Sequence, residues 1–114
     1  MQRTMWLWSV VVLSLVCTTL PGHTDEVQQG PTLTLEQHRF SPTEIRVRAG
    51  TAFVLTIVNK DKEDEEFEIS TLRLEKIIPG GRTLQLKMPA LKPGSYEFVG
   101  EFHENTAKGR LIAE

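Results

Sequence analysis

Short apolar runs with a period of two recur from residue 32 onward, separated by turn residues at intervals of about eight to twelve residues. Residues 44–48 illustrate the pattern, because branched aliphatic side chains alternate there with charged ones. Residues 53–58 form a nearly continuous β-branched run, which is typical of a central, two-sided strand. Pro-Gly turns follow at 79–81 and 93–94, and no segment sustains a helical period. The pattern predicts an all-β fold, a Greek-key β-sandwich of about seven strands.

The first part of the chain has a different character. After a basic start at Arg3, residues 5–20 are almost wholly apolar, and Pro21-Gly22 ends the run. Such a run is short for a membrane span and typical of a secretory signal peptide, so we expect a periplasmic protein with no membrane span after cleavage. The predicted divisions are a signal peptide at 1–24, a flexible tail at 25–31 and one domain at 32–114.

Charge and cysteine content limit the possible functions. Removal of the leader takes away Arg3 and Cys17, so the mature chain carries 12 basic against 15 acidic residues and a net charge of −3. Cys17 is the only cysteine, so the mature domain is expected to have neither a disulfide nor a thiolate. No basic patch indicates nucleic-acid binding.

The negative charge is concentrated in residues 61–68, which hold six acidic residues. Alternation predicts that Phe67 and Ile69 point into the core, which places Glu66 and Glu68 together on the other face, roughly 7 Å apart. Two carboxylates that close repel each other, which raises the pKa of one or favours a bound cation. Glu65 lies two residues before Phe67, so it is expected at the start of this strand with its side chain on the core-facing side. We interpret residues 61–64 as ordinary solvated loop.

Other interpretations of these residues remain open. An acidic run is usually a solvated surface, and Arg73, Lys76 or Lys108 could simply pair with the strand carboxylates. Weaker ligand candidates also exist, and they are His38, Met88 and Glu75.

The order of signals resembles the cupredoxin-like domain family, over almost all of the mature chain. The matching segments are Phe40-x-Pro42-x-x-Ile45-x-Val47-x-Ala49-Gly50-Thr51, Asn59-x-Asp61, Glu66-Phe67-Glu68-Ile69, Pro93-Gly94-x-Tyr96-x-Phe98 and Gly109-x-Leu111. Within it the chain looks most like the small periplasmic domains of bacterial ferrous-iron uptake systems. That closer match lies in Glu65-Glu66-Phe67-Glu68, Leu74-Glu75-Lys76 and Gly100-Glu101-Phe102-His103-x-x-Thr106-Ala107-x-Gly109.

The resemblance also implies which copper ligands this chain retains. A blue-copper site needs a Cys thiolate, two His and usually a distant Met. By the resemblance, Glu65 falls on the first His position, Gly100 on the Cys position and Thr106 near the Met position, while His103 matches the second His. One of four ligands is therefore kept, which excludes blue-copper electron transfer.

These observations predict a protein that binds copper or iron and assists ferrous-iron uptake or oxidation. We expect the metal ligands to come from the acidic strand and the Gly100–His103 segment. The predicted set is Glu65, Glu66, Glu68, Glu101 and His103. The resemblance implies two partners, a membrane iron permease and a periplasmic iron-binding protein.

Two alternatives stay open at this stage. Nothing in the chain indicates hydrolytic chemistry, so enzyme activity is expected only as metal-centred oxidation of ferrous iron. The other alternative is a non-metal interaction module, whose acidic end docks a basic surface on a transporter partner.

Overall fold

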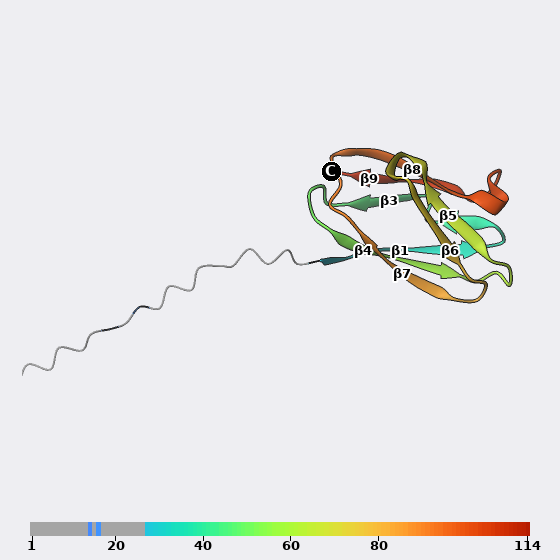
Figure 1. Ribbon diagram of the computed structural model, residues 1–114, viewed down its shortest axis with the longest axis horizontal. Helices are drawn as coiled ribbons and strands as arrows, with labels where there is room; N and C mark the ends of the chain where they lie inside the picture. The colour runs from blue at the N-terminus through green and yellow to red at the C-terminus, as the bar shows by residue number, and fades with distance from the viewer. Residues whose placement is uncertain (1–13, 15, 17–26) are drawn as a thin grey trace, which may run out of the picture.

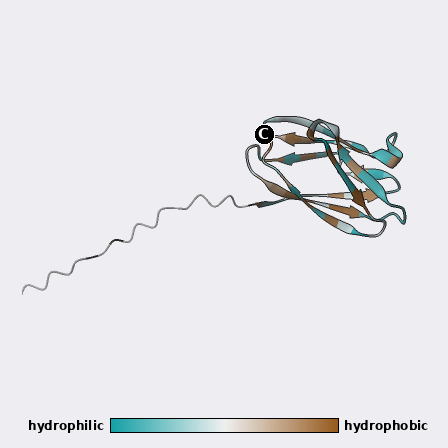
Figure 2. Ribbon diagram, in the orientation of Figure 1, coloured by the Kyte–Doolittle hydropathy of each residue, from teal (hydrophilic) through white to brown (hydrophobic). Residues whose placement is uncertain are grey.

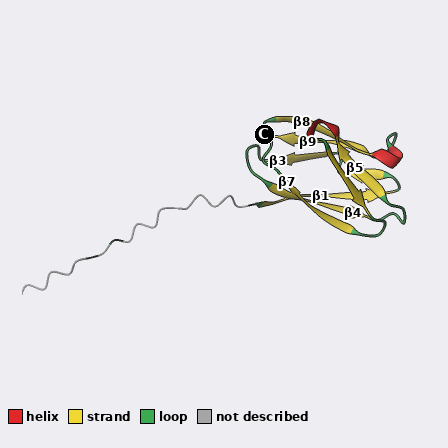
Figure 3. Cartoon of the chain, viewed as in Figure 1, coloured by secondary structure: helices red, strands yellow, loops and turns green. Residues whose placement is uncertain are grey.

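The computed structural model describes residues 14, 16 and 27–114 of this chain, and residues 27–114 form a β-sandwich with two short 3-10 turns (Figures 1 and 3). The strands are β1 (Gln28–Glu36), β2 (Arg39–Ser41), β3 (Glu44–Val47), β4 (Phe53–Asn59), β5 (Glu65–Ile69), β6 (Leu74–Ile78), β7 (Thr83–Met88), β8 (Gly94–Gly100) and β9 (Lys108–Ala113). The 3-10 turns are η1 (Ser70–Leu72) and η2 (Glu101–His103).

Two sheets make the layers of the sandwich. One has the strand order β2-β1-β4-β7 and the other the order β3-β9-β8-β5-β6. Two pairs, β1 with β4 and β3 with β9, are parallel, and the other pairs are antiparallel. The prediction of an all-β sandwich is confirmed, with nine strands in the described residues. One of the additional strands is β2, because Phe40-Ser41, which reads as a break in the sequence, pairs with β1.

Inward-facing residues at alternate strand positions build one core between the sheets (Figure 2). In β5, Phe67 and Ile69 are buried while Glu66 and Glu68 are half-buried on the outer face, as the alternation predicts. The predicted central strand, β4, does lie between β1 and β7, but its outer face is only half-buried.

Three phenylalanine rings join the sheets directly beneath one end of the sandwich. Phe40 meets Phe67 and Phe98 edge-on, with ring centroids 5.9 and 5.4 Å apart. Phe40, Phe67 and Phe98 lie two residues along the chain from His38, Glu65 and Gly100, in that order. A strand presents residues i and i+2 on the same face, so the aromatic layer forms the floor under Glu65 and Gly100.

The strand β1 begins at Gln28, within the segment 25–31 that was predicted to be a tail. Its first residues pair with β4, and the backbone N–H of Gln28 also donates to the carbonyl of Ala52 at 3.0 Å. The ordered sandwich therefore starts before residue 32. The predicted signal peptide lies outside the described residues, apart from positions 14 and 16. Among the described residues, no helix has the length and apolar character needed to cross a bilayer.

The two ends of the sandwich differ in what they contain. The chain terminus Glu114 lies at one end, where its carbonyl accepts a hydrogen bond of 3.0 Å from the N–H of Ala49. The β1–β2 turn, the β4–β5 loop, the β6–β7 turn and η2 gather at the opposite end (Figure 1). This second end, named the loop end, holds His38 in the β1–β2 turn and His103 in η2.

Candidate metal centre at the loop end

The β4–β5 loop is held in shape by a buried asparagine. Asn59 donates from its side-chain amide to the carbonyls of Glu63 and Ile78, at 2.9 and 3.0 Å, and its amide oxygen accepts from the N–H of Asp61 at 3.0 Å. The N–H of Gly80 donates to Asp64 Oδ1 at 3.0 Å, which fixes the loop to the β6–β7 turn. The loop that carries Glu63 is therefore an ordered part of the fold.

The loop also holds the tight turn between β1 and β2. Because Glu36 pairs with Arg39, Gln37 and His38 alone make this turn, and both have left-handed backbones with φ of 52° and 57°. The carboxylate of Asp61 accepts both of their backbone N–H groups, at 2.8 and 3.0 Å. The position of His38 is thus fixed by Asp61, which lies 23 residues later in the sequence.

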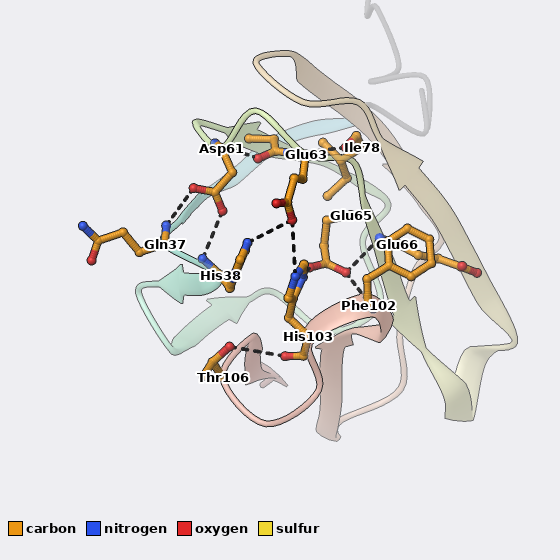
Figure 4. Close-up of polar contacts among 11 residues, drawn as sticks. Gln37, His38, Asp61, Glu63, Glu65, Glu66, Ile78, Phe102, His103 and Thr106 are labelled. Carbon is orange, nitrogen blue, oxygen red and sulfur yellow. Dashed lines mark hydrogen bonds and ion pairs between the residues drawn. The ribbon is translucent and has the colours of Figure 1, made fainter.

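A buried carboxylate orients His103 (Figure 4). Glu65 is 1% exposed, and its Oε2 lies 2.6 Å from His103 Nδ1. Its other oxygen accepts the backbone N–H groups of Phe102 at 2.9 Å and Glu66 at 3.1 Å. A carboxylate only accepts hydrogen bonds, so Nδ1 is the donor and the Nε2 atom of the neutral ring is left with its lone pair.

Both histidines meet a third side chain at the mouth of this end. Their rings stack with centroids 3.5 Å apart and planes 10° from parallel. Glu63 Oε2 lies 3.2 Å from His38 Nε2 and 3.5 Å from His103 Nε2 (Figure 4). One donor atom from each of the three side chains falls within a cluster whose members lie within 4.8 Å of one another. Two imidazoles and a carboxylate in that arrangement are suited to a divalent transition metal.

The carboxyl of Glu65 fills the space beside Gly100. A Cβ atom at position 100 would lie 2.7 Å from the Glu65 carboxyl carbon and 2.8 Å from the Cβ of Ala107. Contacts that short do not occur between unbonded carbons, so the large side chain at 65 and the absence of one at 100 depend on each other.

A second group of carboxylates lies on the outer face of the sheet. Donor atoms of Glu66, Glu75 and Glu101 lie within 4.8 Å of one another. Glu68 is directly opposite Glu75 in the antiparallel β5–β6 pair, which is an unfavourable placement for like charges. Among the described residues, the ion pairs that form do not include these carboxylates, so the alternative pairing with Arg73, Lys76 or Lys108 is not made.

The crowding on the outer face changes acid strength. Partial loss of solvent, followed by the charges and hydrogen bonding of Glu101 and Glu75, raises the pKa of Glu66. The pKa of Glu68 is also raised, first by partial desolvation and then by the charges of Glu101, Glu75 and Glu104. The direction agrees with the expectation for β5, but the cause differs, because desolvation and carboxylates outside β5 raise the two pKa values, and mutual repulsion between Glu66 and Glu68 does not.

The structure divides the five predicted ligands between these two places. Glu65 and His103 are together inside the loop end, whereas Glu66, Glu68 and Glu101 lie on the outer face. Glu101 and His103 are two residues apart, a spacing that would put both side chains on one face of a strand, but η2 turns the chain there and their side chains join different groups. Glu75, held as a weaker candidate, joins the outer group.

Sequence reasoning underestimated three residues, Asp61, Glu63 and His38. Residues 61–64 were interpreted as ordinary solvated loop. Glu63 is indeed exposed, but it contacts both histidines, and Asp61 holds the β1–β2 turn. His38 was only a weak candidate, and the signal that could have raised it is a two-residue hairpin turn occupied by Gln-His instead of glycine or asparagine. Met88, the other weaker candidate, is buried in the core and lies outside both groups.

An open hollow of about 790 Å³ lies on another part of the surface, along β3, β8 and β9. Its charged residues include Glu44 and Arg110, which pair with each other at 3.4 Å. Glu97 and Lys108 also line the hollow, but none of the groups of metal-ligating side chains found among the described residues lies there, so the candidate centre is assigned to the loop end.

The amino-acid sequence matches the model of a known protein family. Residues 6–113 match the family model described as the cupredoxin-like domain. An uncharacterized protein of Rickettsia prowazekii (strain Madrid E) is 39% identical over 80 residues, which is 70% of this chain. The match spans only 64% of that relative's own length.

Solved structures support the same fold at low sequence identity. Auracyanin B superposes with a TM-score of 0.66 at 14% identity, covering 80% of this chain and 92% of that one. The metal-binding domain of the Cu(I)-exporting P-type ATPase of Streptococcus pneumoniae D39, solved with Cu(I), gives a TM-score of 0.62 at 13% identity, covering 80% of this chain and 98% of that domain. At these identities the likeness concerns the fold alone.

Proposed function

Because this chain belongs to the cupredoxin-like domain family, we propose that it binds a transition-metal ion, copper or iron, at the loop end of its sandwich and assists ferrous-iron uptake. The observation that carries the proposal is the meeting of His38, Glu63 and His103 within 4.8 Å. Three side chains from separate loops, each anchored by its own hydrogen bonds or neighbours, present donor atoms to one point. The auracyanin and ATPase-domain folds, one solved with bound Cu(I), add support from the architecture.

The residues present do not fit a blue-copper centre. Such a centre needs a thiolate, and the only cysteine of the sequence, Cys17, lies in the predicted signal peptide. Position 100, which corresponds by resemblance to the thiolate position, has no room for a side chain because of the Glu65 carboxyl. The proposed centre is therefore one of nitrogen and oxygen donors, without the strong colour of a copper–thiolate bond.

The uptake role rests on the resemblance together with the charge of the loop end. We propose a periplasmic location, a membrane iron permease as the receiving partner and a periplasmic iron-binding protein as a second partner. The outer carboxylates, Glu66, Glu68, Glu75 and Glu101, add negative potential beside the centre, which raises the local concentration of cations.

Metal content and uptake together test the proposal. The protein purified from the periplasm is expected to carry copper or iron by elemental analysis. Deletion of the gene should slow the uptake of radioactive ferrous iron in iron-limited cells, and the His103→Ala chain should fail to restore it. Absence of both metals, together with normal uptake in the deletion strain, would contradict the proposal.

One observation favours a second candidate, an interaction module that binds no metal. Phe102 and Ile77 are exposed large apolar residues, 52% and 48% accessible, and Ile77 pairs with Glu66 across β5 and β6. An apolar and acidic surface of this kind suits a partner with a basic rim. This candidate predicts salt-sensitive binding to the permease that persists in chelator and is lost in Phe102→Ala, whereas a metal carrier would bind its partner differently with and without metal.

A further inference from the structure

Building on the proposed function, we propose that His38, Glu63 and His103 form an open-sided Fe(II) site and that Glu65 prepares His103 for it. In this view ferrous iron is the cargo that the domain itself holds. The inference is narrower than the proposed function, because it assigns the ligands, the ion and a positioning residue.

The backbone at His38 gives the first reason to assign it a role. A two-residue hairpin turn with positive φ at both positions favours Asn-Gly, since glycine has no Cβ atom and asparagine tolerates the left-handed conformation better than most other residues. This chain instead has Gln37 and His38 at φ of 52° and 57°. The Asp61 carboxylate holds the turn in place despite the strain. Strain kept at a position whose side chain reaches the other candidate ligands indicates that the side chain is used.

The donor set favours ferrous iron over cuprous copper. Two imidazole nitrogens and one carboxylate, with the remaining positions open, form the ligand set of non-haem Fe(II) centres. Cu(I) prefers thiolate and thioether sulfur, and the nearest methionine along these strands, Met88, is buried in the core away from the cluster. The chemistry of the three donors therefore suits a borderline or hard divalent ion.

The exposure of the three side chains leaves one side of the site accessible. Glu63 is 65% exposed, His38 39% and His103 24%, so solvent reaches the face away from Glu65. Waters can complete an octahedral shell there, whereas a closed four-ligand shell would be typical of structural zinc. Cis donors around an ion lie about 3 Å apart, because metal–nitrogen bonds are about 2.1 Å. Binding thus draws the three donors slightly inward and tilts the stacked rings.

Glu65 acts through His103 and not on the ion. Its Oε2 accepts a hydrogen bond of 2.6 Å from His103 Nδ1–H, which leaves the lone pair of Nε2, the atom that faces Glu63, free to bind a metal ion. A carboxylate behind a ligating imidazole fixes the tautomer and raises the basicity of the ligand. In Glu65→Gln the amide can instead donate to Nδ1, which moves the ring proton to Nε2 and blocks the donor atom. Glu65 is therefore assigned as a positioning residue.

Anaerobic titration of the full-length gene product with Fe(II) tests this inference. One equivalent of Fe(II) should bind, and nitric oxide added to it should give the electron paramagnetic resonance signal of a ferrous-nitrosyl centre, because the site has open positions. His38→Ala, Glu63→Gln and His103→Ala should each weaken Fe(II) binding, and Glu65→Gln should weaken it by about 10–100-fold. The matched control is Glu97→Gln, an exposed carboxylate of β8 that belongs to neither cluster and should retain the affinity and the signal. Glu66→Gln and Glu101→Gln on the outer face should keep the signal and lose only the small part of the affinity that comes from a neighbouring charge.

A second measurement separates positioning from structural damage. Nitrogen NMR of the metal-free protein should show the His103 proton on Nδ1 in the native chain and on Nε2 in Glu65→Gln, with the circular dichroism of the two chains alike. An unchanged tautomer with unchanged Fe(II) affinity would overturn the role of Glu65.

The outcomes for the ion distinguish the inference from the function it rests on. Binding of Cu(II) without any binding of Fe(II) would overturn the Fe(II) site and leave a metal-binding protein. Fe(II) binding that survives all three ligand substitutions and disappears in Glu66→Gln would place the ion on the outer face and overturn the ligand assignment. Failure to bind either ion would overturn both. Each ion must be titrated separately, because almost any site of nitrogen and oxygen donors binds Cu(II) with higher affinity than Fe(II).

Discussion

The carboxylate of Glu65 and the imidazole of His103 are joined by a 2.6 Å hydrogen bond that spans 38 residues of chain. The same carboxylate also receives the N–H groups of Glu66 and Phe102, so one buried side chain ties the start of β5 to η2. Its charge is thus matched by donors from three residues, as a buried carboxylate requires. Because η2 follows β8 directly, these hydrogen bonds hold η2 above the three packed phenylalanine rings at the loop end.

Replacing Glu65 with alanine should therefore lower the free energy of unfolding. Two backbone donors and one ring nitrogen lose their acceptor in a buried place, at a cost on the order of 2–3 kcal/mol, and urea unfolding measures it. Glu65→Gln keeps one acceptor oxygen and should cost less. The control is Glu63→Ala, which removes an exposed carboxylate from the same loop and should stay within about 0.5 kcal/mol of the native chain. Equal losses at 63 and 65 would contradict the anchoring role.

A side chain at position 100 should be tolerated poorly for a related reason. In Gly100→Ala the new Cβ would meet the Glu65 carboxyl carbon at 2.7 Å and the Ala107 Cβ at 2.8 Å. Overpacking of this kind costs about 1–3 kcal/mol. The double variant Gly100→Ala with Glu65→Ala should be less destabilised than the sum of the single variants, since one of the two clashes is gone. Strict additivity in urea unfolding would show that the two positions do not share space.

The strained turn makes a prediction in which stability and metal binding change in opposite directions. Gln37→Gly and His38→Gly should each raise the free energy of unfolding by about 1 kcal/mol, because glycine adopts positive φ without the penalty of a Cβ atom. Only His38→Gly should lose Fe(II) affinity, which makes Gln37→Gly its matched control. Urea unfolding measures the stability, and anaerobic titration measures the Fe(II) affinity. A lower free energy of unfolding in each of the two glycine variants would contradict the assignment of strain.

The sandwich and the facing of β5 were predictable because they depend on local alternation. The period of two along β5 places Phe67 inward, and from that alone Glu65 faces the core and Glu66 and Glu68 face outward, as the structure has them. The same rule says nothing beyond a strand end. Once η2 turns the chain, parity no longer relates Glu101 to His103.

The candidate ligands that the sequence did not single out, His38 and Glu63, lie in loops, where position is decided by contacts between distant segments. His38 reaches the centre only because Asp61 accepts two N–H groups from a turn 23 and 24 residues earlier. Glu63 reaches it because Asn59 bonds across the loop to the carbonyl of residue 63. Neither contact has a periodic signature, so the sequence indicates an acidic loop without indicating which carboxylate is used. The early start of β1 has a similar cause, since polar residues 28–29 are held by backbone pairing with β4.

The crowded outer face predicts a dependence of stability on pH. The pKa values of Glu66 and Glu68 are raised above their ordinary value of 4.5, first by partial desolvation and then by neighbouring carboxylates. Between the unfolded and the folded pKa, the folded chain holds protons that the unfolded chain has released. Each group's contribution to stability is therefore complete below about pH 4.5 and is lost as the pH rises through the folded pKa.

At neutral pH the two charges consequently oppose folding, and Glu66→Gln or Glu68→Gln should raise the free energy of unfolding. The gain should be largest near pH 7 and should shrink as the pH falls through the range where the native carboxyl is protonated anyway. Salt should remove only part of it, because screening weakens the repulsion from Glu101 and Glu75 and leaves the desolvation unchanged. Urea unfolding of both variants from pH 4 to pH 8 measures the effect, with Glu36→Gln at the exposed end of β1 as the control. A gain that grows toward low pH would reverse the sign and contradict the raised pKa.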